Sequence, residues 1–138
     1  MLKGTYLLFM TFICDKRADV GSLGTVRIDA GEYCYVGSAM NGLRRRIERH
    51  LSSEKIMHWH IDRLTVLADR KEAFVSLGPV DECELAAMAE REGCIPTVKG
   101  FGCSDCRCRT HLFTVDERSK QRLLKASDTV PFSPEHHI

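Results

Sequence analysis

The chain has 138 residues, of which 43% are hydrophobic and 28% are charged, and its 20 basic and 19 acidic residues leave a net charge of +1. This composition excludes a disordered chain, a polybasic coat protein and an acidic tail, and it predicts one globular domain over residues 1–138. No apolar run approaches the roughly 20 residues of a membrane span, so we expect no membrane contact.

The first third of the chain has the pattern of three strands. Residues 5–12 are apolar and aromatic throughout, which is typical of a buried strand. Residues 15–24 are polar with two glycines and predict a turn region, whereas residues 25–29 alternate between apolar and polar and residues 33–37 form a third strand. Because short polar turns join these strands, we expect an antiparallel meander.

Helical periodicity begins at residue 43. Leu43, Ile47 and Leu51 recur at intervals of four, which predicts a helix with one face packed on a sheet. The remaining pattern predicts helices over residues 58–68, 82–91 and 117–125, strands over residues 72–77 and 111–115, and a loose tail over residues 126–138 that contains two prolines. We therefore expect an α+β fold, a small antiparallel sheet with helices packed on it.

Charge is unevenly distributed along the chain. Residues 41–63 and residues 97–122 each contain six basic and three acidic residues, whereas residues 69–92 contain three basic and seven acidic residues. The ordinary interpretation is a set of solvated faces. The alternative is a phosphate-binding surface beside a carboxylate that holds a cation.

Short motifs in separate elements carry residues that suit phosphodiester chemistry. Tyr6 closes a Gly-Thr-Tyr motif in the first strand, and Tyr35 opens a Tyr-Val-Gly motif in the third. Arg46 and His50 lie one turn apart on the next helix, and Glu82 begins a later helix. In this combination and order the sequence resembles the GIY-YIG nuclease superfamily, which has a Gly-x-Tyr strand, a Tyr-x-Gly strand, an arginine on the following helix and a glutamate on a later one.

The resemblance implies a role in DNA cleavage for each of these residues. Phosphodiester hydrolysis needs a cation, a positioned water, a base and a positive group. Glu82 would bind Mg²⁺ or Mn²⁺, Arg46 would contact phosphate, and His50 would assist. Tyr6 or Tyr35 would activate water, because a nearby cation and arginine can lower the pKa of a tyrosine from about 10. The DNA backbone would be bound by the other arginines of the same helix, Arg44, Arg45 and Arg49.

Further motifs are similar to one uncharacterised GIY-YIG-like branch, whose domains occur alone or fused to endonuclease III-type DNA glycosylases. They comprise residues 58–62, residues 100–102, and the group Cys106, Cys108 and His111. This resemblance covers residues 4–115 and implies DNA repair, with DNA and a repair glycosylase as partners. The chain departs from the superfamily in the 28 residues between Tyr6 and Tyr35, which require an inserted hairpin or loop, and in Ser38, which stands where a lysine is common.

Cysteines suggest a second kind of site. Cys103, Cys106, Cys108 and His111 lie within nine residues and have ligand types that can bind Zn²⁺. The second half of this spacing is cramped, so we favour a metal-free structural loop over a zinc site. The whole chain has seven cysteines, an odd number that fits reduced thiols in the cytoplasm better than a disulfide framework.

Structural interpretations remain open for every motif. Taken singly, the tyrosines fit sheet aromatics, the arginines fit a solvated helix face, and Glu82 fits a first-turn residue that favours the helix dipole. His58 and Asp62 can pair on one helix face or share a metal, and we favour a structural role for both. At the level of function, the alternatives are a non-catalytic nucleic-acid-binding module that partners a repair enzyme, and a structural zinc domain for protein contacts.

Overall fold

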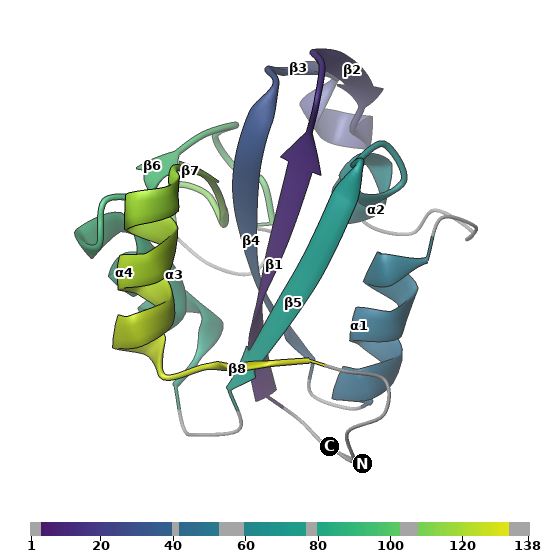
Figure 1. Ribbon diagram of the computed structural model, residues 1–138. Coiled ribbons are helices and arrows are strands. Elements are labelled where there is room, and N and C mark those ends of the chain that lie inside the picture. The colour runs from purple at the N-terminus through teal and green to yellow at the C-terminus, as the bar shows by residue number, and fades with distance from the viewer. Residues whose placement is uncertain (1–3, 40–41, 53–59, 77–79, 103–107, 133–138) are drawn as a thin grey trace.

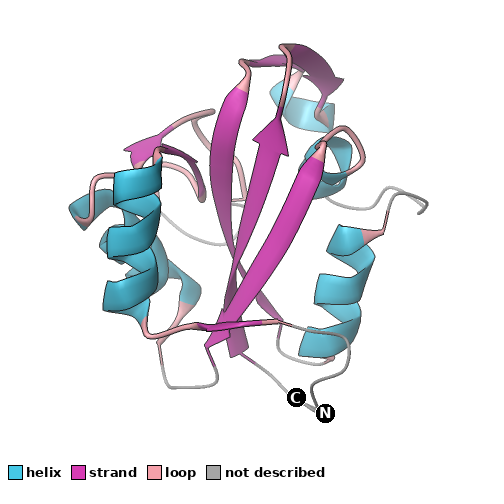
Figure 2. Cartoon of the chain, viewed as in Figure 1, coloured by secondary structure: helices cyan, strands magenta, loops and turns pink. Residues whose placement is uncertain are grey.

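The computed structural model describes residues 4–39, 42–52, 60–76, 80–102 and 108–132. In chain order its elements are β1 (Gly4–Phe12), β2 (Lys16–Asp19), the 3₁₀ turn η1 (Gly21–Leu23), β3 (Thr25–Ile28), β4 (Gly31–Ala39), α1 (Leu43–Leu51), α2 (His60–Thr65), β5 (Arg70–Ser76), α3 (Glu82–Arg91), β6 (Ile95–Pro96), β7 (Leu112–Val115), α4 (Glu117–Ser127) and β8 (Val130–Pro131). Six strands pair antiparallel in the order β6-β7-β4-β1-β5-β8, and β2 and β3 form a separate hairpin (Figures 1 and 2). The predicted α+β fold is confirmed.

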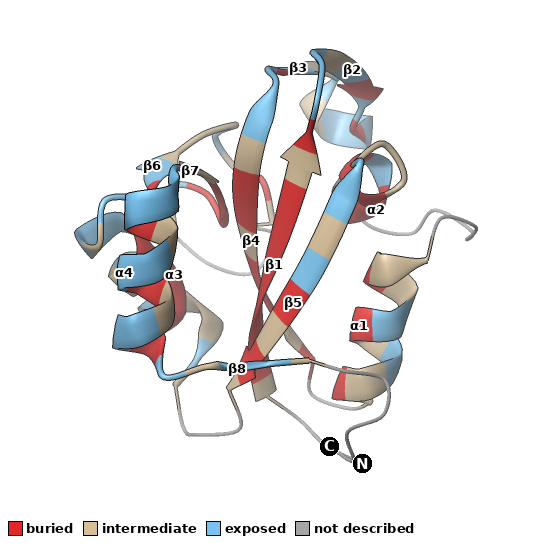
Figure 3. Ribbon diagram, viewed as in Figure 1, coloured by how far each residue is buried: buried red, intermediate tan, exposed pale blue. Residues whose placement is uncertain are grey.

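The central strand β1 is buried on both faces of the sheet, so it is a nearly continuous apolar run. Because side chains alternate along a strand, Tyr6 and Leu8 face one side and Leu7 and Phe9 the other. The helices α1 and α2 cover the face of Tyr6, and α3 and α4 cover the opposite face (Figures 1 and 3). The sheet therefore lies between two helical layers, with a core on each side.

Local signals fix where two helices begin. Asp81 caps α3, since its carboxylate accepts a hydrogen bond of 2.8 Å from the backbone N–H of Glu84. Asp116 and Ser119 form a reciprocal capping box at the start of α4. Such caps typically stabilise a helix by about 0.5–2 kcal/mol. The first turn of α3, which carries Glu82, is therefore held in place by its own cap.

The predicted antiparallel meander is wrong about the partner of its second strand. The strand over residues 25–28 does not join the main sheet but pairs with β2, which lies in the segment predicted as a turn, and β4 pairs with β1 instead. The hairpin is polar on its outer side and buries Ala18 and Ile28, with β2 against α2. This hairpin is the insertion that the spacing between the two tyrosine motifs required.

The segment after α4 is paired to the sheet as far as the structure describes it. Val130 and Pro131 of β8 lie opposite β5, and the backbone N–H of Phe132 donates to the carbonyl of Ala73 at 2.8 Å. Part of the predicted loose tail is therefore ordered against β5, and residues 133–138 lie outside the described residues. None of the helices in the described ranges is long and apolar enough to cross a membrane.

Candidate active site

The two motif tyrosines lie on neighbouring strands, as expected. The β1–β4 register places Tyr6 opposite Gly37 and Leu8 opposite Tyr35, so the tyrosines are diagonal neighbours on the face covered by α1. Their ring centroids are 6.3 Å apart with an interplanar angle of 49°. Long aromatic side chains reach this diagonal position, and the pairing of the strands therefore brings the two rings together.

Two glycines make room for these rings. A Cβ on Gly37 would lie 2.4 Å from Cζ and Oη of Tyr6, so only glycine fits at the end of the Tyr-Val-Gly motif. A Cβ on Gly102 would lie 3.1 Å from Cε1 of Tyr35 and 3.3 Å from Cβ of His111. Tyr35 and His111 are therefore neighbours across Gly102, which also has the positive φ of 73° that favours glycine.

His50 joins the tyrosines from the last turn of α1. It is buried, with 1% of its surface exposed, and its Nε2 lies 2.6 Å from the hydroxyl oxygen of Tyr6. The His50 ring is also 5.3 Å from the ring of Tyr6 and 6.3 Å from that of Tyr35, measured between centroids. A short hydrogen bond of this kind, shielded from water, positions both groups firmly.

Burial raises the pKa of the Tyr6 hydroxyl well above its ordinary value, and the neighbouring Tyr35 raises this pKa further. The charge and hydrogen bonding of Arg46 lower the pKa, but they do not outweigh the loss of water. The expected lowering of the pKa is therefore wrong for Tyr6 in the chain by itself. Tyr6 is a neutral hydroxyl at physiological pH.

Arg46 lies one helical turn before His50 on α1. Its Nη1 donates a 3.0 Å hydrogen bond to the backbone carbonyl of Ser38, which anchors the guanidinium to the end of β4. The same guanidinium acts on the Tyr6 hydroxyl by charge and by hydrogen bonding. The positively charged guanidinium of Arg46 is thus held beside the Tyr6–His50 pair.

Glu82 approaches from α3, on the other side of the sheet. Its Oε2 lies 3.6 Å from Nδ1 of His111, and its side chain is 34% exposed. The charge of Glu82 also contributes to the raised pKa of Tyr6. The carboxylate therefore lies within electrostatic reach of the Tyr6 hydroxyl. We call Tyr6, Tyr35, Arg46, His50 and Glu82 the tyrosine cluster.

The other arginines of α1 have different surroundings. Arg49 Nη2 donates to Oδ2 of Asp62 at 2.7 Å, and the Asp62 side chain is fully buried. Arg44 lies 3.5 Å from Glu48 on the helix surface, and Arg45 is exposed. The role of these arginines in binding DNA stays a prediction. The Arg49–Asp62 pair links α1 to α2, in line with the structural role favoured for Asp62.

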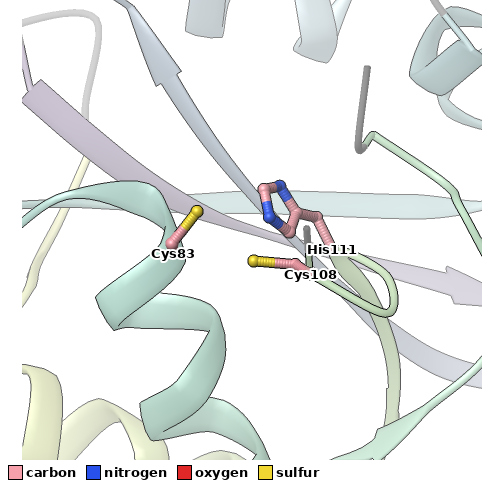
Figure 4. Close-up of side chains that lie close together, drawn as sticks. All are labelled: Cys83, Cys108 and His111. Carbon is pink, nitrogen blue, oxygen red and sulfur yellow. The ribbon is translucent and has the colours of Figure 1, made fainter. Parts of the chain in front are cut away.

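A second group of side chains lies beside Glu82. Cys83, Cys108 and His111 have ligand atoms that all lie within 4.8 Å of one another (Figure 4). We call this group the thiol cluster. The sequence indicated Cys108 and His111, but it missed Cys83, because no spacing rule connects a helix residue to a loop 25 residues later. Cys103, Cys106 and His58 lie outside the described residues.

One protein-family comparison identifies the chain. Residues 5–130 match the model of a family described as "Domain of unknown function DUF123". The matched span includes every residue of the tyrosine cluster and of the thiol cluster, and the chain belongs to this family. No curated protein and no solved structure matches the chain.

Proposed function

We propose that this member of the DUF123 family is a metal-dependent DNA endonuclease of GIY-YIG type that acts on structured or damaged DNA in repair. The observation that carries the proposal is the buried 2.6 Å contact between Tyr6 and His50, with the Arg46 guanidinium beside it. A buried tyrosine hydroxyl needs a hydrogen-bond partner whatever its role, but an imidazole and a guanidinium at one hydroxyl also supply a proton acceptor and a positive charge. Proton transfer beside a phosphate uses both.

Glu82 is the residue that would hold Mg²⁺ or Mn²⁺. Its carboxylate is partly exposed at the start of α3 and offers the oxygen donor that hard cations prefer. A divalent cation held by a single carboxylate keeps several waters, so Glu82 alone suffices as the protein ligand. When bound, such an ion supplies charge stabilisation for the phosphate group.

Arg46 would stabilise the negative charge that develops on the phosphate oxygens. Guanidinium groups match phosphate geometry and carry a permanent charge. The hydrogen bond to Ser38 fixes Arg46 before substrate binds, so little reorganisation is needed during the reaction. The positive charge of Arg46 also favours approach of the DNA backbone to this end of the sheet.

Tyr6 and His50 would together accept the proton of the attacking water. Because Tyr6 keeps its own proton and its oxygen faces Arg46, the hydroxyl is placed to donate to Nε2 of His50. Tyr6 is buried in the free chain, so this step requires that substrate binding opens a path from the attacking water to the Tyr6 oxygen. As the water oxygen bonds to phosphorus, its proton passes to the Tyr6 oxygen and the Tyr6 proton passes to Nε2. The bond from phosphorus to the leaving oxygen then breaks, and solvent returns a proton to that oxygen. A neutral tyrosine can thus relay a proton without forming a free phenolate.

The net charge of +1 points to a compact substrate. Few phosphates can be neutralised at once, so a long smooth duplex would be bound weakly. Branched, nicked or damaged DNA presents its reactive phosphate at one place and suits a small site. A repair glycosylase that exposes damaged sites is the partner that fits this activity.

A panel of DNA substrates tests the proposal directly. Plain, nicked, branched and damaged duplexes are incubated with the chain in Mg²⁺ or Mn²⁺, with a chelator control, and the product ends are mapped. We expect metal-dependent cleavage of at least one structured substrate. Binding of these DNAs without cleavage of any of them would contradict the endonuclease and favour a non-catalytic nucleic-acid-binding module.

A further inference from the structure

Figure 4 shows two sulfurs and an imidazole edge directed at a common point between α3 and the segment before β7. Cys83 comes from the first turn of α3, whereas Cys108 and His111 come from the segment before β7. Around a tetrahedral Zn²⁺ with bonds of about 2.0–2.3 Å, the ligand atoms lie about 3.7 Å apart. Separations within 4.8 Å therefore reach this geometry by small side-chain rotations.

The chemistry of the three donors selects a soft or borderline metal. Two thiolates and an imidazole are the ligands of zinc sites, whereas Mg²⁺ and Mn²⁺ prefer oxygen. Both cysteines are half-buried, and His111 is fully buried. Among the described residues, this is the one group of three His, Cys, Asp or Glu side chains close enough to hold a metal ion.

A second observation concerns the orientation of the imidazole. Nδ1 of His111 lies 3.6 Å from the Glu82 carboxylate, which leaves Nε2 for a metal. Histidines that bind metals commonly direct their other ring nitrogen toward a carboxylate, which fixes the ring and raises its basicity. Glu82, next to Cys83 on α3, therefore places a carboxylate near this nitrogen, at a distance longer than a hydrogen bond.

We propose that Cys83, Cys108 and His111 bind a Zn²⁺ ion whose fourth position is open to water. The metal would join α3 to the segment before β7, two parts of the chain that the Arg109–Glu90 ion pair also links. The site differs from a loop-only cluster of neighbouring cysteines, because its essential ligand is on a helix. Its consequence for catalysis, which rests on the proposed function, is that the ion holds the turn that carries Glu82.

Metal analysis and thiol protection test the site without any variant. Protein purified under reducing conditions with no added metal is expected to contain one Zn²⁺ per chain, and Co²⁺ in its place is expected to give thiolate charge-transfer absorption. Bound zinc should protect Cys83 and Cys108 from iodoacetamide, as read by peptide mass spectrometry, and a chelator should expose both thiols and lower the melting temperature. Cys14, which is exposed, should react equally in both states.

Serine variants add a matched comparison. Cys83→Ser and Cys108→Ser are each expected to lose the zinc, whereas Cys14→Ser keeps it. Two results would overturn the site: a wild-type chain that binds neither zinc nor cobalt at one ion per chain, or Cys83 reacting equally with and without zinc. The readouts need no DNA. Tyr6→Phe changes no residue of the thiol cluster and is expected to slow cleavage while keeping one zinc per chain, so failure of the nuclease and failure of the zinc site are distinguishable.

Discussion

Tyr6 is the residue whose surroundings define the tyrosine cluster. Its ring lies over Gly37, its hydroxyl contacts His50, and Arg46 adds a positive charge beside it. These contacts explain the Tyr-Val-Gly motif in physical terms, because the glycine is needed by the ring of the other tyrosine motif. They also turn a buried hydroxyl, which would otherwise be costly, into a well-positioned donor.

The first prediction concerns this hydroxyl. Tyr6→Phe keeps the ring and removes the proton path to His50, so we expect the rate of DNA cleavage to fall by about 10²–10⁴-fold. Tyr33→Phe is the matched control, since the Tyr33 hydroxyl donates to the Asp29 carbonyl away from the cluster. Single-turnover cleavage of the best substrate measures both. Equal rates for Tyr6→Phe and Tyr33→Phe would show that the Tyr6 hydroxyl has no part in the reaction.

The second prediction concerns Cys94, whose thiol has a pKa raised to about 11 by burial. The folded chain holds this proton more tightly than the unfolded chain, whose thiol has a pKa of about 9. The free energy of unfolding therefore falls as the pH rises from 9 toward 11, by up to about 2 kcal/mol from this group. Cys94→Ala should reduce that fall.

Urea denaturation in reducing buffer at about pH 8 and about pH 10.5 measures the loss of stability. Cys14→Ala is the control, because this thiol is exposed. Buried Cys34 also has a raised pKa, so part of the wild-type fall should remain in Cys94→Ala. If the free energy of unfolding of Cys94→Ala fell between the two pH values as much as that of the wild type, the raised pKa of Cys94 would not be the cause.

At the scale of elements, α1 combines three tasks on one short helix. Leu43 and Ile47 pack into the core, His50 and Arg46 reach the tyrosines, and Arg49 pairs with buried Asp62 on α2. The arginines of this helix therefore make different contacts. Which arginine faces which partner depends on the helix rotation that burial of the apolar stripe imposes.

The third prediction separates two of these arginines. Arg49→Ala leaves the Asp62 carboxylate buried without its guanidinium, and we expect the free energy of unfolding to fall by about 3 kcal/mol. Exposed Arg45→Ala should change it by less than about 0.5 kcal/mol, while lowering the salt dependence of DNA binding by about one unit of slope. Thermal unfolding and salt-dependent binding measure the two effects. Equal free energies of unfolding for Arg49→Ala and Arg45→Ala would show that the Arg49–Asp62 pair contributes little to stability.

The elements also show which patterns in the sequence are informative. The apolar run of β1 and the four-residue repeat of α1 predicted both elements, because burial alone dictates those patterns. The hairpin of β2 and β3 was predicted only in part. Its two strands are short and polar, and half of their residues are exposed. The hydropathy pattern therefore does not indicate that β2 and β3 pair with each other rather than with the main sheet.

At the scale of the whole molecule, the sheet brings α1 and α3 to one site from opposite faces. Gly102 lies against both Tyr35 and His111, and Nδ1 of His111 lies 3.6 Å from the Glu82 carboxylate. The tyrosine cluster and the thiol cluster are therefore adjacent. A metal at the thiol cluster would act on the proposed nuclease site through the position of α3.

Long-range proximity of this kind explains what the sequence could not predict. Motifs and a family resemblance predicted the residues of the tyrosine cluster. A resemblance can do this because proteins of one fold bring the same motif positions together in space. The proximity of Cys83 to Cys108 has no local pattern in the sequence, and the burial of Tyr6, which raises its pKa, follows only from the packed structure.

The most direct measurement compares two glutamates on the first turn of α3. Glu82→Gln removes the carboxylate assigned to the cation, whereas Glu84→Gln changes an exposed carboxylate two residues later. Single-turnover cleavage in Mg²⁺ and DNA affinity are determined for both variants and the wild type. We expect Glu82→Gln to lose cleavage while its DNA affinity stays within a few-fold, and Glu84→Gln to match the wild type. Metal-dependent cleavage at an undiminished rate by Glu82→Gln would contradict the assignment of this carboxylate.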